Sequence, residues 1–299
     1  MCHTHKNVRK TVASAGNLYF HSFVLVLDSD TNLALLHNAW DHAVHDFDIL
    51  RTTFHYVGEL ASWVQARHSI VKLDWQECVS IPSAFFQHAV DKLFSQLKPA
   101  DESAFSYPPM HLRVVHTDTA GLYLVLFVHH ALYDGLSIPS LLSHVEHIYK
   151  DHETTPPAQF FDFIPRILSQ QEHATAYWTQ RLRNYHPATP LRNTSLTSKA
   201  TFMSRLVSVP RESLMQLVHD NAITLQCVAQ AAWAKYLALL HSLNDVVFGH
   251  VVSGRSFDDS EKVVGPMLVS EIWGVVGGDT QLSFKFRIQS LVASDSFHI

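Results

Sequence analysis

The chain has 299 residues, of which 47% are hydrophobic and 16% charged, and its formal net charge is −5. This composition supplies a substantial core, enough for one large domain or two medium ones, and argues against disorder. The acidic balance gives no support for nucleic-acid binding, and no apolar run reaches the roughly 18 residues that span a membrane. Cys2, Cys78 and Cys227 are too scattered for a disulfide framework. With no signal peptide at the N-terminus, we expect a cytoplasmic protein.

The first half of the chain has the patterning of a mixed sheet covered by helices. Residues 1–10 are polar and carry no periodic signal. The predicted elements that follow are a strand at 18–27, a helix at 31–47, strands at 50–57, 61–65 and 71–75, a helix at 83–97 and a strand at 110–116. The last of these strands is expected to pair with the next one along the chain.

The most informative stretch runs from residue 122 to residue 149. Residues 122–128 are apolar without alternation, which indicates a strand buried on both faces. Ser137 is expected to cap a helix whose apolar residues follow at helical spacing as far as Tyr149. Between the strand and the helix stand His129-His130-Ala131-Leu132-Tyr133-Asp134-Gly135. Two imidazoles and a carboxylate therefore lie at a strand-to-helix connection, where scaffolds tend to hold reacting groups.

This arrangement suits proton handling during acyl transfer. Consecutive strand residues point to opposite faces, so only one of His129 and His130 can face a given cavity. A histidine can accept a proton from an attacking amine or hydroxyl near neutral pH. Asp134 is expected to pair with a cation, and Gly135 to allow a tight turn and offer its N–H to an oxyanion or a reacting nitrogen. The alternative is a buried strand, an Asp-Gly turn and two histidines placed by chance in a His-rich chain.

The second half begins after residues 151–157, a charged, Pro-containing segment that we interpret as a linker. A helix at 160–182 and a turn-rich stretch at 185–198 are predicted next. A strand at 201–209, helices at 211–221 and 224–241, and a strand at 246–252 partly repeat the first half. Two similar lobes with a cleft between them would suit two substrates. After residue 268 the character changes, and only residues 282–288 alternate.

The chain has 22 histidines, so metal binding has to be considered. His42 and His45, and likewise His144 and His147, can each share a helix face at i,i+3. Neither pair has a cysteine or carboxylate at a recognised ligand spacing, and we expect solvated helix faces and no metal. No nucleotide-binding glycine loop or serine-hydrolase motif is present.

Several pieces of the sequence together resemble one family, the condensation domains of nonribosomal peptide synthetases, within the HHxxxDG acyltransferases of the chloramphenicol acetyltransferase-like fold. Residues 129–135 match HHxxxDG, and residues 48–54 are similar to the LRTxF element. The other matching pieces are Phe161-Asp162-Phe163, the Tyr177-Trp178 pair, residues 249–255 ending in Gly-Arg, and Gly265-Pro266-Met267-Leu268. The resemblance implies an α/β (α+β), two-lobed mixed-sheet sandwich with helices.

The resemblance covers about residues 17–268, and two departures limit it. The family's opening Gln-containing motif is not recognisable in residues 1–10, and Val269-Ser270-Glu271-Ile272-Trp273 stands where an Asn-Thr-x-Pro-type strand is expected. We therefore expect a truncated domain that is poorly soluble alone. Its parts would be an N-terminal lobe at 11–155, a connection at 156–198, a partial C-terminal lobe at 199–268 and a divergent tail at 269–299.

The resemblance implies a mechanism in which carrier proteins deliver acyl groups as phosphopantetheine thioesters, with no permanently bound cofactor. The acceptor amine or hydroxyl attacks the donor thioester to form an amide or ester. His130 would orient or deprotonate the acceptor, His129 would be mostly structural, and the Gly135 N–H would help hold the tetrahedral centre. Asp134 would pair with Arg255 from the second lobe, and Arg51 would be a structural contact in the first lobe. An exposed cation is the equal alternative for Arg51.

Three functions remain open at this stage. The first is a condensation enzyme of secondary metabolism, acting on small acyl and amino-acid substrates. The second is a truncated, non-catalytic domain that docks carrier proteins, and the third is a stand-alone acyltransferase that uses coenzyme A thioesters. Residues 18–20 and 48–52 are similar to those of fungal siderophore synthetases, but the sequence does not identify the substrates.

Overall fold

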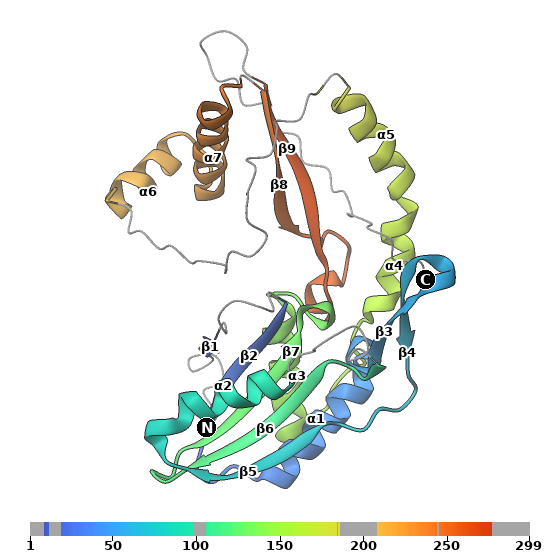
Figure 1. Cartoon of the computed structure of the whole chain (residues 1–299), viewed down its shortest axis with the longest axis vertical. Helices are drawn as coiled ribbons and strands as arrows, with labels where there is room; N and C mark the ends of the chain where they lie inside the picture. The colour runs from blue at the N-terminus through green and yellow to red at the C-terminus, as the bar shows by residue number, and fades with distance from the viewer. Residues whose placement is uncertain are drawn as a thin grey trace. The chain divides into compact units, whose positions relative to one another are not determined.

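The computed structural model describes residues 9–11, 19–97, 106–183, 185, 208–243 and 245–276 (Figure 1). Their contacts divide the chain into two compact units. Of the described residues, those up to residue 169 together with Ser253–Leu268 belong to unit 1, and the remainder belong to unit 2.

Unit 1 is built on a five-stranded sheet with the order β1-β2-β7-β6-β5. Its strands are β1 (Arg9–Thr11), β2 (Phe20–Leu27), β5 (Trp75–Ile81), β6 (Met110–Thr117) and β7 (Leu122–His129). All neighbours pair antiparallel except β5 and β6, which are parallel. The strand before the HHxxxDG residues is therefore the middle strand of the sheet, and the predicted pairing of residues 110–116 with it is confirmed.

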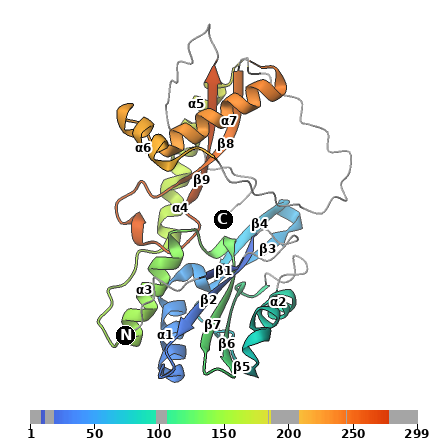
Figure 2. The same cartoon turned by 90° about the vertical axis from the view of Figure 1, so that its left-hand side faces the viewer.

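Helices cover both faces of this sheet, as Figure 2 shows, with α1 (Leu33–Asp46) and α3 (Ser137–Tyr149) on one side and α2 (Phe86–Leu97) on the other. Along β7, Leu124, Leu126 and Val128 join the core under α1 and α3, while Val125 and Phe127 join the core under α2. The prediction of a strand buried on both faces is confirmed. Its lack of alternation follows from having an apolar core on each side.

The segment from α1 to β6 matches the predictions in part. Asn32 caps α1, because its side chain accepts hydrogen bonds from the N–H groups of Ala34 and Leu35. Residues 50–51 were predicted as strand but belong to the 3-10 helix η1 (Asp48–Arg51), and the hairpin of β3 (Thr52–Val57) and β4 (Ser62–Arg67) starts after it. The strand predicted at 71–75 is wrong, because β5 begins only at Trp75. Helix α2 follows the short 3-10 turn η3 (Ser83–Phe85) as expected.

The single helix predicted at 160–182 is two helices, α4 (Phe160–Ser169) and α5 (Gln171–Arg181). The first belongs to unit 1 and the second to unit 2. Unit 2 also contains α6 (Arg211–Asp220), α7 (Leu225–His241) and, apart from the end residues Ser253 and Leu268, the two-stranded sheet of β8 (Asp245–Ser253) and β9 (Leu268–Val276). Strand β9 occupies the start of the region expected to diverge. Residues 201–207 of the strand predicted at 201–209, residues 186–198 of the turn-rich stretch predicted at 185–198, and the run at 282–288 lie outside the described residues. The described residues 208 and 209 are not in a strand.

In the part of the chain that the structure describes, no single helix is long and apolar enough to cross a membrane. Helices α6 and α7 together have the necessary length and apolar composition, but the chain bends by 100° between them.

Candidate active site

The HHxxxDG residues form the connection from β7 to α3. His129 is the last residue of β7, and His130 opens the 3-10 helix η5 (His130–Leu132). The predicted separation of the two imidazoles by strand alternation does not apply, because His129 ends the strand while His130 already belongs to the turn. The Nδ1 atom of His129 accepts a hydrogen bond of 3.1 Å from the N–H of Ala131, so His129 caps the turn.

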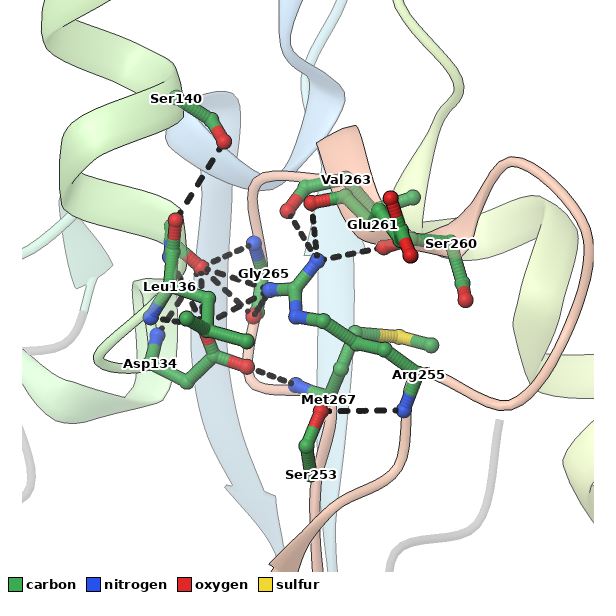
Figure 3. A network of polar contacts seen from close by, with 11 residues as sticks. Asp134, Leu136, Ser140, Ser253, Arg255, Ser260, Glu261, Val263, Gly265 and Met267 are labelled. Atoms are coloured by element: carbon green, nitrogen blue, oxygen red, sulfur yellow. Dashed lines mark hydrogen bonds and ion pairs between the residues drawn. The ribbon is translucent and has the colours of Figure 1, made fainter.

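Asp134 lies at the centre of a buried polar network (Figure 3). Its side chain is 1% exposed. Oδ1 accepts hydrogen bonds from the N–H groups of Leu136 and Ser137, from the Ser137 hydroxyl at 2.8 Å and from the Arg255 guanidinium at 2.7 Å. Oδ2 accepts from the N–H of Met267 at 3.2 Å. Both carboxylate oxygens are therefore engaged in contacts that hold the loop.

Arg255 supplies the opposite charge, and the predicted Asp134–Arg255 pair is confirmed. Its side chain is 3% exposed. The second guanidinium branch donates to the backbone carbonyls of Ser260 at 2.5 Å and Val263 at 2.8 Å. Arg255 therefore holds the Ser253–Leu268 segment against the start of α3. By its contacts this segment belongs to unit 1, whereas the sequence interpretation assigned Arg255 to the second lobe.

Ser137 has a different role from the predicted one. It is the first residue of α3 and not its N-cap, because Asp134 Oδ1 accepts from its N–H. Its hydroxyl lies within 3.0 Å of Asp134 Oδ1, the Gly265 carbonyl oxygen and the Gly265 nitrogen. The side chain is fully buried. This hydroxyl joins the motif to the segment near Arg255, a function that no local sequence signal shows.

Gly265 allows that close approach. Its φ is +156°, and an added Cβ would lie 2.5 Å from the ring of Phe160 in α4. A side chain at this position would have to displace the side chain of Phe160. The segment Gly265-Pro266-Met267, which matched the family in sequence, therefore contributes backbone groups to the Asp134 network.

His130 is half-buried and has a different environment from His129. Its ring stacks on the ring of Tyr133, with the centroids 4.9 Å apart and the planes at 15°. Among the described residues, neither ring nitrogen of His130 makes a hydrogen bond. The nitrogens of this imidazole are thus not committed to any group of the described residues, in contrast to the carboxylate of Asp134.

The pKa of His129 is lowered to about 4, first by burial and then by repulsion from His130 and His21. His129 is therefore neutral near pH 7, which agrees with its Nδ1 accepting the Ala131 N–H. A neutral imidazole committed to a backbone contact is a structural group. The role that the resemblance implies for His129 is consistent with this geometry.

The remaining predicted site residues are Gly135 and Arg51. Gly135 is exposed, and an added Cβ would meet nothing within 4 Å. It is absent from the residues of positive φ, so the backbone there does not require glycine. Arg51 is half-buried and donates to the carbonyls of Val44, at 3.1 Å, and His68. It is a structural contact, and the alternative of an exposed cation is wrong.

A cavity of about 430 Å³ lies at the start of β5 and β6, and its walls include Val44, Leu50, Leu73, Trp75, Met110 and His111. None of the HHxxxDG residues lines it.

In the described part of the chain there is no cluster of three or more side chains suited to a metal ion. His144 does not lie on a solvated face as predicted, because it is 11% exposed and hydrogen-bonded at 2.7 Å to Asp46.

Comparison with known proteins decides the family. The family model described as "Condensation domain" matches residues 8–272, which is most of the chain. The chain belongs to the condensation domain family. The match begins before the region where the resemblance was recognised in the sequence and ends within β9, so residues 269–272 are part of the condensation domain and not a divergent tail.

The relatives of this condensation domain include fungal synthetases. It is 36% identical over 268 residues to nonribosomal peptide synthetase NPS2 of Ceriporiopsis subvermispora and 37% identical over 265 residues to coprinoferrin synthetase of Coprinopsis cinerea. Each alignment covers 87% of this chain but only 11% and 10% of those proteins. The chain thus spans about a tenth of the length of the curated relatives it matches.

Solved structures confirm the predicted fold class. The condensation domain from Monacolin K polyketide synthase MokA aligns with a TM-score of 0.65 at 16% identity, over 87% of this chain and 64% of that one. The crystal structure of selenomethionine-labelled CT aligns with a TM-score of 0.69 at 22% identity, over 87% of this chain and 58% of that one. The chain has the chloramphenicol acetyltransferase-like α/β fold.

Proposed function

We propose that this chain forms amide bonds, or ester bonds, between acyl and aminoacyl thioesters carried on phosphopantetheine by carrier proteins. Its setting would be nonribosomal peptide synthesis of a secondary metabolite. Membership of the condensation domain family supports the reaction class, and similarity to coprinoferrin synthetase and to the ferrichrome siderophore peptide synthetase of Mycosarcoma maydis, 30% identical over 263 residues, favours a siderophore. The thioester cofactor belongs to the carrier proteins, so the chain itself needs none.

One observation supports the proposal above the others. A half-buried imidazole, His130, has nitrogens that no described residue binds, and it directly precedes a loop that Asp134 and Arg255 hold in place. A general base has to be held in a fixed position while its nitrogen stays open to the substrate. A carboxylate that accepts five hydrogen bonds supplies the rigidity, and the adjacent ring supplies the reactive atom.

The proposed reaction balances without any further reagent. The acceptor nitrogen attacks the donor thioester carbonyl, and a proton passes from that nitrogen to His130. The C–S bond then breaks, the amide forms, and the departing thiolate takes up the proton. The Gly135 N–H would face the tetrahedral oxygen, which is compatible with the open space around Gly135.

The test is a condensation assay with purified chain, an acyl-loaded donor carrier protein and an aminoacyl-loaded acceptor carrier protein, with product detected by mass spectrometry. We expect amide product with the wild-type chain, and a loss of about 100-fold or more with His130→Ala. His45→Ala is the matched control, because His45 is 80% exposed. Carrier binding without product would favour the docking function, and turnover with free acyl-CoA alone would favour the stand-alone acyltransferase.

A further inference from the structure

The Asp134 network leaves open which group orients His130. Histidine bases are commonly aligned by a carboxylate or carbonyl that accepts from the second ring nitrogen. Asp134 does not do this here, because its oxygens are bound to Leu136, Ser137, Arg255 and Met267. In the described part of the chain no other group hydrogen-bonds to the His130 ring, so there its orientation comes from packing.

The packing partner is Tyr133. Its ring lies parallel to the His130 ring within 15°, at a centroid distance of 4.9 Å, and covers one face of the imidazole. Tyr133 is 3% exposed and belongs to the core under α1 and α3. A stacked contact restrains the plane of the imidazole while both nitrogens, which lie on the ring edge, remain available.

Tyr133 is itself fixed by strand β2. Its hydroxyl is hydrogen-bonded to Nδ1 of His21, and Phe23 meets its ring edge-to-face at 5.6 Å. Burial raises the pKa of the Tyr133 phenol, so the hydroxyl keeps its proton near neutral pH. The period-2 alternation of β2 places His21 and Phe23 on the same face of the sheet.

His21 also contacts His130 directly. Its ring lies 5.7 Å from the His130 ring, at an interplanar angle of 63°. His21 is 6% exposed. The His130 imidazole thus has a parallel neighbour in Tyr133 and a tilted neighbour in His21, and those two neighbours are hydrogen-bonded to each other.

We propose that Tyr133 and His21 are positioning residues for His130, holding the imidazole plane toward the acceptor nucleophile through the stack and the Tyr133–His21 hydrogen bond. This inference rests on the proposed condensation reaction. It requires that loss of the stack reduces the rate of the chemical step without weakening the binding of carrier proteins, because neither residue is part of the reacting centre.

The experiment compares Tyr133→Leu, Tyr133→Phe and His21→Ala in the full chain. Tyr133→Leu removes the stack, Tyr133→Phe removes only the hydroxyl, and His21→Ala removes its partner. Tyr149→Phe is the matched control, because the Tyr149 hydroxyl is likewise hydrogen-bonded, accepting from the N–H of Asn32 away from the motif. Each variant is measured for kcat, for KM toward the acceptor carrier and for the NMR shift of the His130 Cε1–H signal, assigned with His130→Gln.

We expect kcat to fall about 10- to 100-fold for Tyr133→Leu and less for the other two, with KM within about twofold of wild type. The His130 signal should carry an upfield ring-current shift that Tyr133→Leu abolishes and Tyr149→Phe preserves. If Tyr133→Leu fails to fold, Tyr133→Phe and His21→Ala still test the hydrogen bond by the same readouts. An unmoved His130 signal in Tyr133→Leu, or kcat values equal to those of Tyr149→Phe, would overturn the proposal.

The two readouts separate this inference from the proposed function. A wild-type chain that makes no amide refutes the condensation reaction, while the His130 signal still reports whether Tyr133 and His21 hold the ring. A wild-type chain that makes amide, with variants that keep full kcat, refutes the positioning role alone.

Discussion

Removing the Asp134 carboxylate should destabilise the chain more than any single surface change. Asp134→Ala would leave the Arg255 guanidinium, 3% exposed, without its counter-charge and would release the N–H groups of Leu136, Ser137 and Met267. Breaking a buried ion pair from one side costs about 3–5 kcal/mol. Arg255 would still donate hydrogen bonds to the backbone carbonyls of Ser260 and Val263. We therefore expect Asp134→Ala to lower the free energy of unfolding by about 3 kcal/mol, the lower end of that range.

The assay is urea unfolding at pH 7, followed by circular dichroism, with the free energy of unfolding compared at constant m-value. Lys150→Ala, which breaks the exposed i,i+4 pair with Glu146, is the control and should cost about 0.5 kcal/mol or less. The double variant Asp134→Leu/Arg255→Met should lose less free energy of unfolding than the single variants Asp134→Leu and Arg255→Met added together. The reason is that the two charges are removed as a pair. A loss below about 1 kcal/mol for Asp134→Ala, or strictly additive losses in the double variant, would refute this account of the network.

Three further predictions concern neighbouring residues. The pKa of His129 is about 4 in the folded chain and 6.5 in the unfolded chain, so unfolding takes up a proton between these pH values and the free energy of unfolding should fall as pH drops from 6.5 toward 4. Between pH 7 and pH 5, His129→Asn should lose less of its free energy of unfolding than the wild type does. Equal losses in the two chains would contradict the pKa shift. Gly265→Ala, which places a Cβ against Phe160, should cost about 2 kcal/mol or more in urea unfolding, whereas Gly135→Ala should cost about 0.5 or less, and similar costs for both would be contrary evidence. Arg51→Ala, which removes two hydrogen bonds to backbone carbonyls, should lower the melting temperature by the equivalent of about 1–3 kcal/mol, and an unchanged melting temperature would argue against its structural role.

The parts of the fold that could be predicted are those that local patterns determine. The non-alternating run at 122–128 predicted the middle strand because both of its faces are covered, and helical spacing predicted α1, α2, α3 and α7. Two elements that were missed in unit 1 are edge strands of the five-stranded sheet. Residues 9–11 form β1 and residues 75–81 form β5, and each is held by backbone pairing to a single neighbour, which polar or irregular side chains do not reveal.

The sequence predicted only those site residues that belong to a recognised family motif. The family resemblance supplied the Asp134–Arg255 pair, whose partners lie 121 residues apart. Ser137 was taken for a helix cap because Ser is a frequent cap, yet its hydroxyl reaches Gly265, 128 residues away. His21 and Tyr133 were missed because each is unremarkable in its own segment, and their hydrogen bond spans 112 residues. A histidine within the apolar strand β2 was the one available signal.

The most direct test of the central claim is single-turnover condensation by the wild-type chain and by His130→Ala, with both carrier proteins loaded and both chains shown to be folded. The account predicts amide product from the wild type and a loss of about 100-fold or more in the rate for His130→Ala, with carrier binding unchanged. An equal rate for the two chains, or no product from a wild-type chain that binds both carriers, would contradict it.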